Sequence, residues 1–137
     1  MKSFTDLVQS KKLAEILPLE SADMHYNNVS IKGINYVDEH RAELMEYNRA
    51  VKVLSKYIIN PLFEVIPCWS LVALLRVIPK HIKNFNVLRI DISEKDFALW
   101  YDEIGYGVNT ELPDIKIECP VDACVEMIIK LKEKNLL

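Results

Sequence analysis

The sequence predicts an α+β fold in which an antiparallel sheet of about three strands is packed by helices. Apolar and polar residues alternate near 87–118, which is typical of strands in a meander. The run Pro67–Pro79 is the most apolar stretch and is bracketed by prolines, which are tolerated at the start of a helix but not inside it. Apolar residues between Asp38 and Ile58 repeat at intervals of three and four, which indicates an amphipathic helix. Helices are therefore expected near 5–17, 38–58, 69–78 and 120–134.

The size and composition favour one globular domain. The chain has 137 residues, and we expect residues 1–137 to form a single domain. Half of the residues are hydrophobic and 27% are charged, which fits a protein with a core and is too apolar for disorder. The formal net charge of −3 lacks the basic excess of a general nucleic-acid binder, so nucleic acid is a disfavoured partner.

The cellular location is inferred from three features. Met1–Asp6 lacks the apolar segment of a secretory signal, and no run approaches the ~20 apolar residues of a membrane span. The cysteines Cys68, Cys119 and Cys124 show no CxxC spacing and are interpreted as free thiols in a reducing compartment. We therefore expect a cytoplasmic protein with no membrane partner.

The first part of the chain gives the weaker structural signals. Ser3 or Thr5 is the expected cap of a first helix that Pro18 stops. Residues 20–28 are rich in turn formers and are expected to form a loop. Alternation on both sides of a glycine predicts a short hairpin over Val29–Tyr36.

The helix expected at 38–58 has the clearest apolar stripe, made by Leu44, Tyr47, Val51, Leu54 and Ile58. The stripe is too short for a long coiled coil and favours a helix that faces the core. A homodimer formed through this helix is the alternative.

The apolar run Pro67–Pro79 is expected to form a short helix between its two prolines. One face carries Leu71, Leu74, Leu75 and Ile78. Ser70 lies outside any GxSxG motif and is interpreted as a helix cap rather than a nucleophile.

The second half of the chain predicts a meander and a closing helix. Val87–Ile92 and Phe97–Asp102 are expected to pair around a polar four-residue turn. After a bend at Gly105-Tyr106-Gly107, Ile115–Glu118 is expected to be the third strand. Pro120 is well placed at the first position of the last helix, in which Glu126 and Lys130 form a favourable i,i+4 pair.

Two blocks of sequence carry a resemblance. One is Pro67-x-Trp69-Ser70-Leu71-x-x-Leu74-Leu75, closed by Pro79, and the other is Pro120-Val121-Asp122-Ala123-Cys124-Val125-Glu126-Met127-Ile128-Ile129. Together they resemble a group of small uncharacterised proteins of gut Bacteroidales genomes and of their phages and prophages. The resemblance covers roughly the second half of the chain. It implies a helix, a strand hairpin and a closing helix in that order, and it brings no activity, because none is established for the group.

Three aromatic residues are the candidate binding residues: Trp69, Trp100 and Tyr101. Trp100 and Tyr101 are neighbours on a strand and must point to opposite faces, so one of them is expected to face solvent or a partner. Trp69 at the start of its helix is most simply a core anchor.

No residue is assigned a catalytic role, and no metal or cofactor is expected. His25, His40 and His81 lack HxH or HExxH spacing, so solvated or packed histidines are the favoured interpretation. Cys68 lies near a helix start, where a thiol pKa falls, but no base is identifiable beside it, and a packed small hydrophobe is favoured.

The leading functional hypothesis is a small non-enzymatic protein-binding or adaptor protein, for which the resemblance implies a phage or prophage origin. One alternative is a small hydrolase or transferase with a site assembled around Cys68 and His81. The other is a nucleic-acid-associated protein, which the negative charge disfavours.

Overall fold

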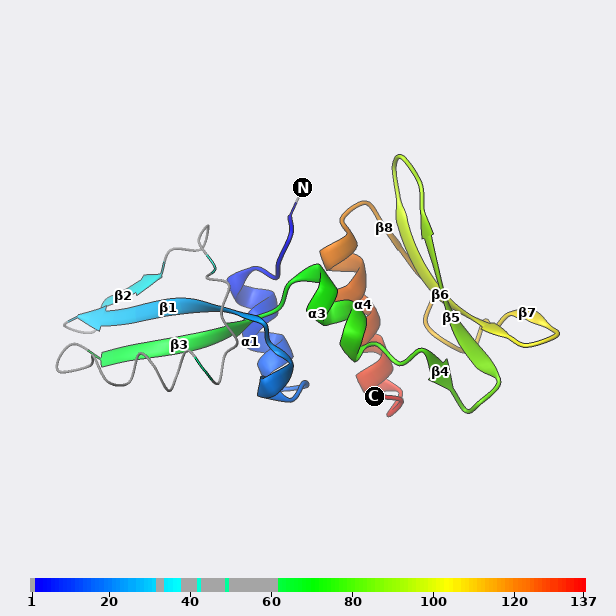
Figure 1. Ribbon diagram of the computed structural model, residues 1–137, viewed down its shortest axis with the longest axis horizontal. Coiled ribbons are helices and arrows are strands. Elements are labelled where there is room, and N and C mark those ends of the chain that lie inside the picture. The colour runs from blue at the N-terminus through cyan, green and yellow to red at the C-terminus, as the bar shows by residue number, and fades with distance from the viewer. Residues whose placement is uncertain (1, 32–33, 38–41, 43–48, 50–61) are drawn as a thin grey trace. The chain divides into compact units, whose positions relative to one another are not determined.

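The computed structural model (Figure 1) describes residues 2–31, 34–37, 42, 49 and 62–137. The chain divides into two compact units. Phe4–Ala73 forms one, called here the N-terminal unit, and residues 1–3 with Leu74–Leu137 form the other, called the C-terminal unit. The expectation of a single domain stays a prediction, because two compact units can belong to one domain or to two.

The N-terminal unit is built on a three-stranded antiparallel sheet. Its strands are β1 (Met24–Ile31), β2 (Ile34–Val37) and β3 (Leu62–Cys68), in the order β2-β1-β3 (Figure 1). The predicted hairpin over Val29–Tyr36 is confirmed by the β1–β2 pairing. The loop predicted over 20–28 is wrong from Met24 onward, because that segment pairs with β3.

Helix α1 (Leu7–Ala14) is shorter than the predicted 5–17, and its cap is Asp6 rather than Ser3 or Thr5. The Asp6 carboxylate accepts from the Gln9 N–H (2.8 Å), and the Gln9 side chain accepts from the Asp6 N–H (3.1 Å). A short 3-10 helix, η1 (Leu19–Ser21), follows. The Thr5 hydroxyl instead accepts from the Trp69 backbone N–H.

The core of the N-terminal unit gathers around the β1–β3 pairing. Met24, Tyr26, Ile66 and Cys68 are buried together, with Phe4, Leu7 and Ala42 packed against them. The rings of Phe4 and Tyr26 meet edge to face at 6.3 Å. The segment ahead of α1 therefore belongs to the same core as the sheet.

The predicted helix start at Pro67 is wrong. Pro67 lies in β3, opposite His25, and helix α3 (Leu71–Val77) begins four residues later, at a turn capped by Ser70. The Ser70 hydroxyl accepts from the Ala73 N–H (3.2 Å), and the Asp23 carboxylate accepts from both the Ser70 N–H (2.8 Å) and the Ser70 hydroxyl. The predicted cap is thus confirmed.

The C-terminal unit contains a five-stranded sheet rather than one of about three strands. The strands are β4 (His81–Ile82), β5 (Asn86–Ile92), β6 (Phe97–Glu103), β7 (Gly107–Val108) and β8 (Ile115–Ile117). The predicted meander is confirmed as β5, β6 and β8, which pair antiparallel. β4 and β7 were missed because two residues are too few to show alternation.

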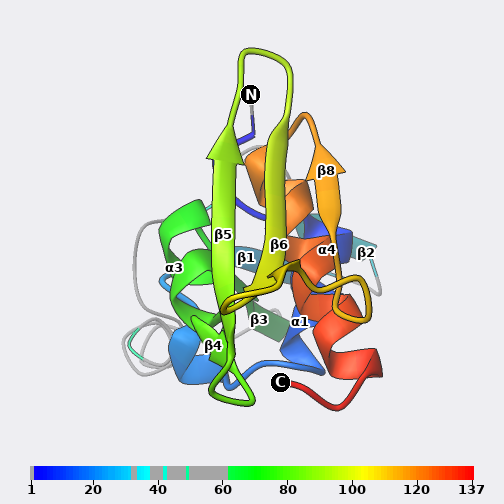
Figure 2. The same cartoon turned by 90° about the vertical axis from the view of Figure 1, so that its right-hand side faces the viewer.

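Helix α4 (Pro120–Glu133) contacts β6 and β8 (Figure 2). Pro120 occupies its first turn as predicted, and the Glu126–Lys130 ion pair forms at 3.4 Å. The buried side chains of the helix include Val121, Val125 and Leu131. These side chains form one side of the core of the C-terminal unit. Alternate side chains of β6, which are also buried, form the other side.

The described residues therefore form antiparallel sheets of three and five strands with helices, which is an α+β architecture. The helix predicted at 38–58, and with it the homodimer through that helix, lies outside the described residues apart from Ala42 and Arg49.

Candidate functional site

Trp69 is a fully buried anchor of the N-terminal unit. Its indole N–H donates to the Ser21 hydroxyl (2.9 Å), and its backbone N–H donates to the Thr5 hydroxyl (3.1 Å). The Thr5 N–H in turn donates to the Trp69 carbonyl (3.0 Å). Trp69, a candidate binding residue whose simplest interpretation was a core anchor, is thus enclosed, with its polar atom satisfied.

Trp100 and Tyr101 take opposite faces of β6, as their adjacency requires. Tyr101 is fully buried, and its hydroxyl donates to the Pro79 carbonyl (2.7 Å). Burial raises the pKa of Tyr101 above its ordinary value. Trp100 is half-buried, so it is the one of the three predicted binding residues that reaches the surface.

A polar array holds Trp100 in place on the outer face of the sheet. Its indole N–H donates to one oxygen of Asp102 (2.8 Å), and the Arg89 Nε donates to the other (3.0 Å). Arg89 lies directly opposite Trp100 in the β5–β6 register. The indole is therefore oriented by a carboxylate that is itself fixed by a cation.

Exposed apolar side chains gather beyond this array, at the end of the sheet where β5 begins and β6 ends. We call them the end cluster: Phe85, Ile104, Tyr106 and Val108, which are 53% to 85% exposed. The Ile104 N–H donates to the Phe85 carbonyl (2.8 Å), which extends the β5–β6 ladder by one pair. Val108 lies opposite Asp102 in the β6–β7 register, so the end cluster adjoins the Trp100 array.

Two glycines make the turn that carries Tyr106. Gly105 and Gly107 have φ of +87° and +82°, a left-handed region that residues with a Cβ rarely adopt. The Tyr106 N–H donates to the Glu103 carbonyl (3.0 Å), which closes the turn. This geometry exposes a large aromatic ring at the tip of a tight connection.

The sequence indicated this turn but did not indicate the end cluster. Phe85 and Ile104 are 19 positions apart in the sequence, and only the register of β5 with β6 brings them together. One signal in the sequence was Tyr106 between two glycines. An aromatic ring at the tip of a tight turn has no core to pack into and is therefore expected to be exposed.

Cys68, the proposed nucleophile of the hydrolase alternative, is a fully buried thiol. It lies 3.5 Å from both the hydroxyl and the carbonyl oxygen of Thr5. Burial raises its pKa, and the hydrogen bonds of Thr5, Ser10 and Tyr26 only partly oppose this effect. His81 is exposed on β4 of the C-terminal unit. The thiol is thus kept protonated and shielded, which disfavours nucleophilic catalysis.

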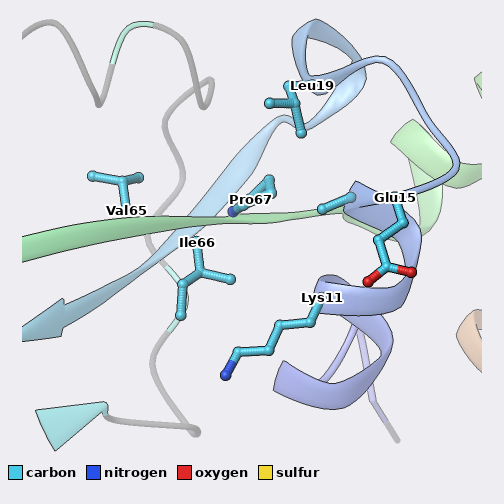
Figure 3. A pocket seen from close by; sticks show the side chains of 7 residues that line it. Lys11, Glu15, Leu19, Val65, Ile66 and Pro67 are labelled. Carbon is cyan, nitrogen blue, oxygen red and sulfur yellow. The ribbon is translucent and has the colours of Figure 1, made fainter. Parts of the chain in front are cut away.

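A pocket of about 440 Å³ lies beside α1 and β3 of the N-terminal unit (Figure 3). Its size is in the range of small-molecule sites. It is lined by Lys11, Ala14, Glu15, Leu19, Val65, Ile66 and Pro67. Its charged groups are Lys11, on α1, and Glu15, the residue that caps the end of α1. The pocket thus combines apolar walls with one pair of opposite charges.

Neither a metal site nor a membrane span is found in the described part of the chain. Within residues 2–31, 34–37, 42, 49 and 62–137, no three side chains of His, Cys, Asp or Glu converge as metal ligands. Over the same residues, no helix is both long and apolar enough to cross a bilayer.

Comparison of the chain with protein-family models, with curated proteins and with solved structures found no match. The resemblance to the Bacteroidales and phage group therefore stays a prediction that is based on the two sequence blocks alone.

Proposed function

We propose that this chain is a small non-enzymatic protein-binding or adaptor protein that contacts its partner through the end cluster. The observation that carries the proposal is the grouping of four large exposed apolar side chains at one end of the five-stranded sheet. Single exposed apolar residues are normal on a protein surface, whereas contiguous ones mark interaction sites.

The surroundings of the end cluster fit a protein partner. Tyr106 and Phe85 are aromatic, and aromatic side chains supply much of the binding energy in interfaces. Asp102, which lies opposite Val108, and Arg89, which donates to it, provide the polar rim that such interfaces have. Trp100, which the sequence singled out, is half-buried beside this rim, and its indole N–H donates to Asp102 (2.8 Å).

The rest of the proposal concerns origin and location. The two sequence blocks support a phage or prophage origin, and three free cysteines support a reducing compartment such as the cytoplasm. Cys68 gives no support to the hydrolase alternative, and no observation favours nucleic acid over protein.

The test begins with a photo-crosslinking amino acid at position 106, used in the source cells to trap and identify the partner. The purified partner is then titrated against the full chain and against Phe85→Ala and Tyr106→Ala. We expect each substitution to weaken binding by about tenfold or more, because each truncates an aromatic anchor.

The matched control is Val8→Ala, which truncates an apolar side chain of α1 that is 79% exposed. We expect this variant to bind as the unaltered chain does. Equal weakening by Val8→Ala would contradict the role of the end cluster. Turnover of a substrate that a single polar substitution abolishes would contradict the non-enzymatic assignment.

A further inference from the structure

The pocket beside α1 and β3 is not used by the proposed function (Figure 3). Its volume is about 440 Å³. A single water takes about 30 Å³ in the liquid, so the pocket is large enough for a small organic molecule. On the α1 side it is lined by Ala14, whose side chain is only a methyl group and leaves this space open.

Two opposite charges border the pocket. Lys11 and Glu15 are four positions apart, and Glu15 caps α1 with a helical backbone conformation (φ −81°, ψ −18°). Both side chains therefore leave the same flank of the helix. In Figure 3 the Lys11 ammonium extends toward Ile66 and away from the Glu15 carboxylate. The pocket thus has a positive and a negative group at separate places on its border.

Neither charge is used elsewhere in the part of the chain that the structure describes. Among those residues, the side chains of Lys11 and Glu15 take part in no ion pair, with each other or with a third group. A lysine that precedes a glutamate by four positions is the less favourable order for a helical pair. The C-terminal end of a helix also carries partial negative charge, so Glu15 and the end of α1 both favour a cation between them.

The rest of the lining is apolar and comes from β3 and from η1. It consists of Leu19, Val65, Ile66 and Pro67. The three strand residues are buried, and Leu19 is half-buried. Figure 3 shows Ile66 on one side of β3 and Val65 and Pro67 on the other, so the apolar lining follows the edge of the strand. Such walls favour an aliphatic or aromatic group, which leaves water on entering the pocket.

We propose that this pocket binds a free α-amino acid with a large apolar side chain, in its zwitterionic form. The Lys11 ammonium faces the ligand carboxylate, the Glu15 carboxylate faces the ligand ammonium, and the ligand side chain packs on the β3 wall. Only a zwitterion satisfies both charges at once, since a simple acid is repelled by Glu15 and a simple amine by Lys11. A peptide carries its two charges at opposite ends and does not fit this arrangement.

The test is titration of the full chain with L-leucine, followed through the backbone amide signals in NMR spectra. We expect saturable shifts at Lys11, at Glu15 and along β3, with a dissociation constant in the millimolar range or lower. N-acetyl-L-leucine lacks the ammonium, and L-leucinamide lacks the carboxylate. Each should bind about fivefold more weakly than leucine, which corresponds to the loss of one exposed ion pair.

Charge-removing variants identify which group each residue contacts. Lys11→Gln should weaken leucine binding about fivefold and should leave leucinamide binding unchanged, because that ligand has no carboxylate. Glu15→Gln should weaken leucine binding and leave N-acetyl-leucine binding no weaker than before. Lys12→Gln is the matched control, since it removes the same charge as Lys11→Gln from an exposed α1 residue outside the pocket lining. It should leave all three dissociation constants unchanged.

The inference is independent of the proposed function, because the pocket belongs to the N-terminal unit and the end cluster to the C-terminal unit. Ala14→Leu tests the location, since leucine fills the pocket, keeps both charges and is well tolerated in helices. This variant should no longer bind leucine. Undiminished binding by Ala14→Leu would overturn the inference. Equal binding of the three ligands, or the absence of any saturable shift with leucine, would overturn it as well.

Discussion

The indole N–H of Trp69 donates a 2.9 Å hydrogen bond to the hydroxyl of Ser21, which itself donates to the Pro18 carbonyl at 2.6 Å. The Ser21 hydroxyl thus uses its proton on Pro18 and accepts from Trp69. These hydrogen bonds attach the short helix η1 to Trp69, the residue directly before the helix cap Ser70.

Trp69→Phe should lower the free energy of unfolding by about 2 kcal/mol, because the smaller ring leaves a void and Ser21 loses its donor. Chemical denaturation measures this loss. In a double-mutant cycle with Ser21→Ala, the combined loss should be smaller than the sum of the two single losses. Strict additivity would mean that the indole–hydroxyl bond contributes nothing.

Thr5→Val should be more destabilising than Thr5→Ser. Valine keeps the volume but leaves the buried Trp69 backbone N–H without an acceptor, at a cost of about 1–3 kcal/mol, whereas serine keeps the hydroxyl. Urea unfolding of both variants tests this order. A valine variant that is as stable as the serine variant, or more stable, would contradict this role of the hydroxyl.

The protein should lose stability as the pH rises between about 9 and about 12. Burial raises the pKa of Cys124 from its ordinary value of 9.0 to about 12. The native thiol therefore keeps its proton in this window while the unfolded thiol loses it. Unfolding is then favoured by up to about 1.4 kcal/mol per pH unit for this group.

Denaturation curves at a series of pH values measure the slope, which should become shallower in Cys124→Ala. Tyr101 contributes with the same sign, since its pKa is also raised by burial, so some slope should remain. An unchanged slope in Cys124→Ala would contradict the assignment to this thiol.

Gly105→Ala should cost about 1 kcal/mol of stability, because alanine is strained at a φ of +87°. A Cβ at this position would meet no atom within 4 Å, so the cost is conformational rather than steric. Gly105→Asn should cost less, since asparagine tolerates this region better. Thermal unfolding compares the two variants, and a larger loss for asparagine would contradict this explanation.

The sequence predicted the parts of the fold that have a regular pattern. The alternation over Val87–Ile92 and Phe97–Asp102 was sufficient for the hairpin, and Pro120 was sufficient for the start of α4. Pro67 misled the prediction, because proline is also compatible with a strand that lacks a neighbour on one side. In the described sheet, β3 is such an edge strand.

The candidate site was less accessible to sequence reasoning. Trp69 and Tyr101 were chosen as aromatic residues, but burial depends on which elements pack around them. The end cluster depends on the β5–β6 register, which joins Ile104 to Phe85. The sequence did predict that Trp100 and Tyr101 take opposite faces of the sheet, because they are neighbours on a strand. It did not predict which of the two side chains is buried.

The contacts between Thr5 and Trp69 also bear on how the chain is made. Thr5 is synthesised long before Trp69. The hydrogen bonds between these two residues therefore cannot form until residue 69 has left the ribosome. Until then, Phe4 and Leu7 remain open to chaperones. Closure of this long loop is therefore expected to pace the maturation of the N-terminal unit during translation.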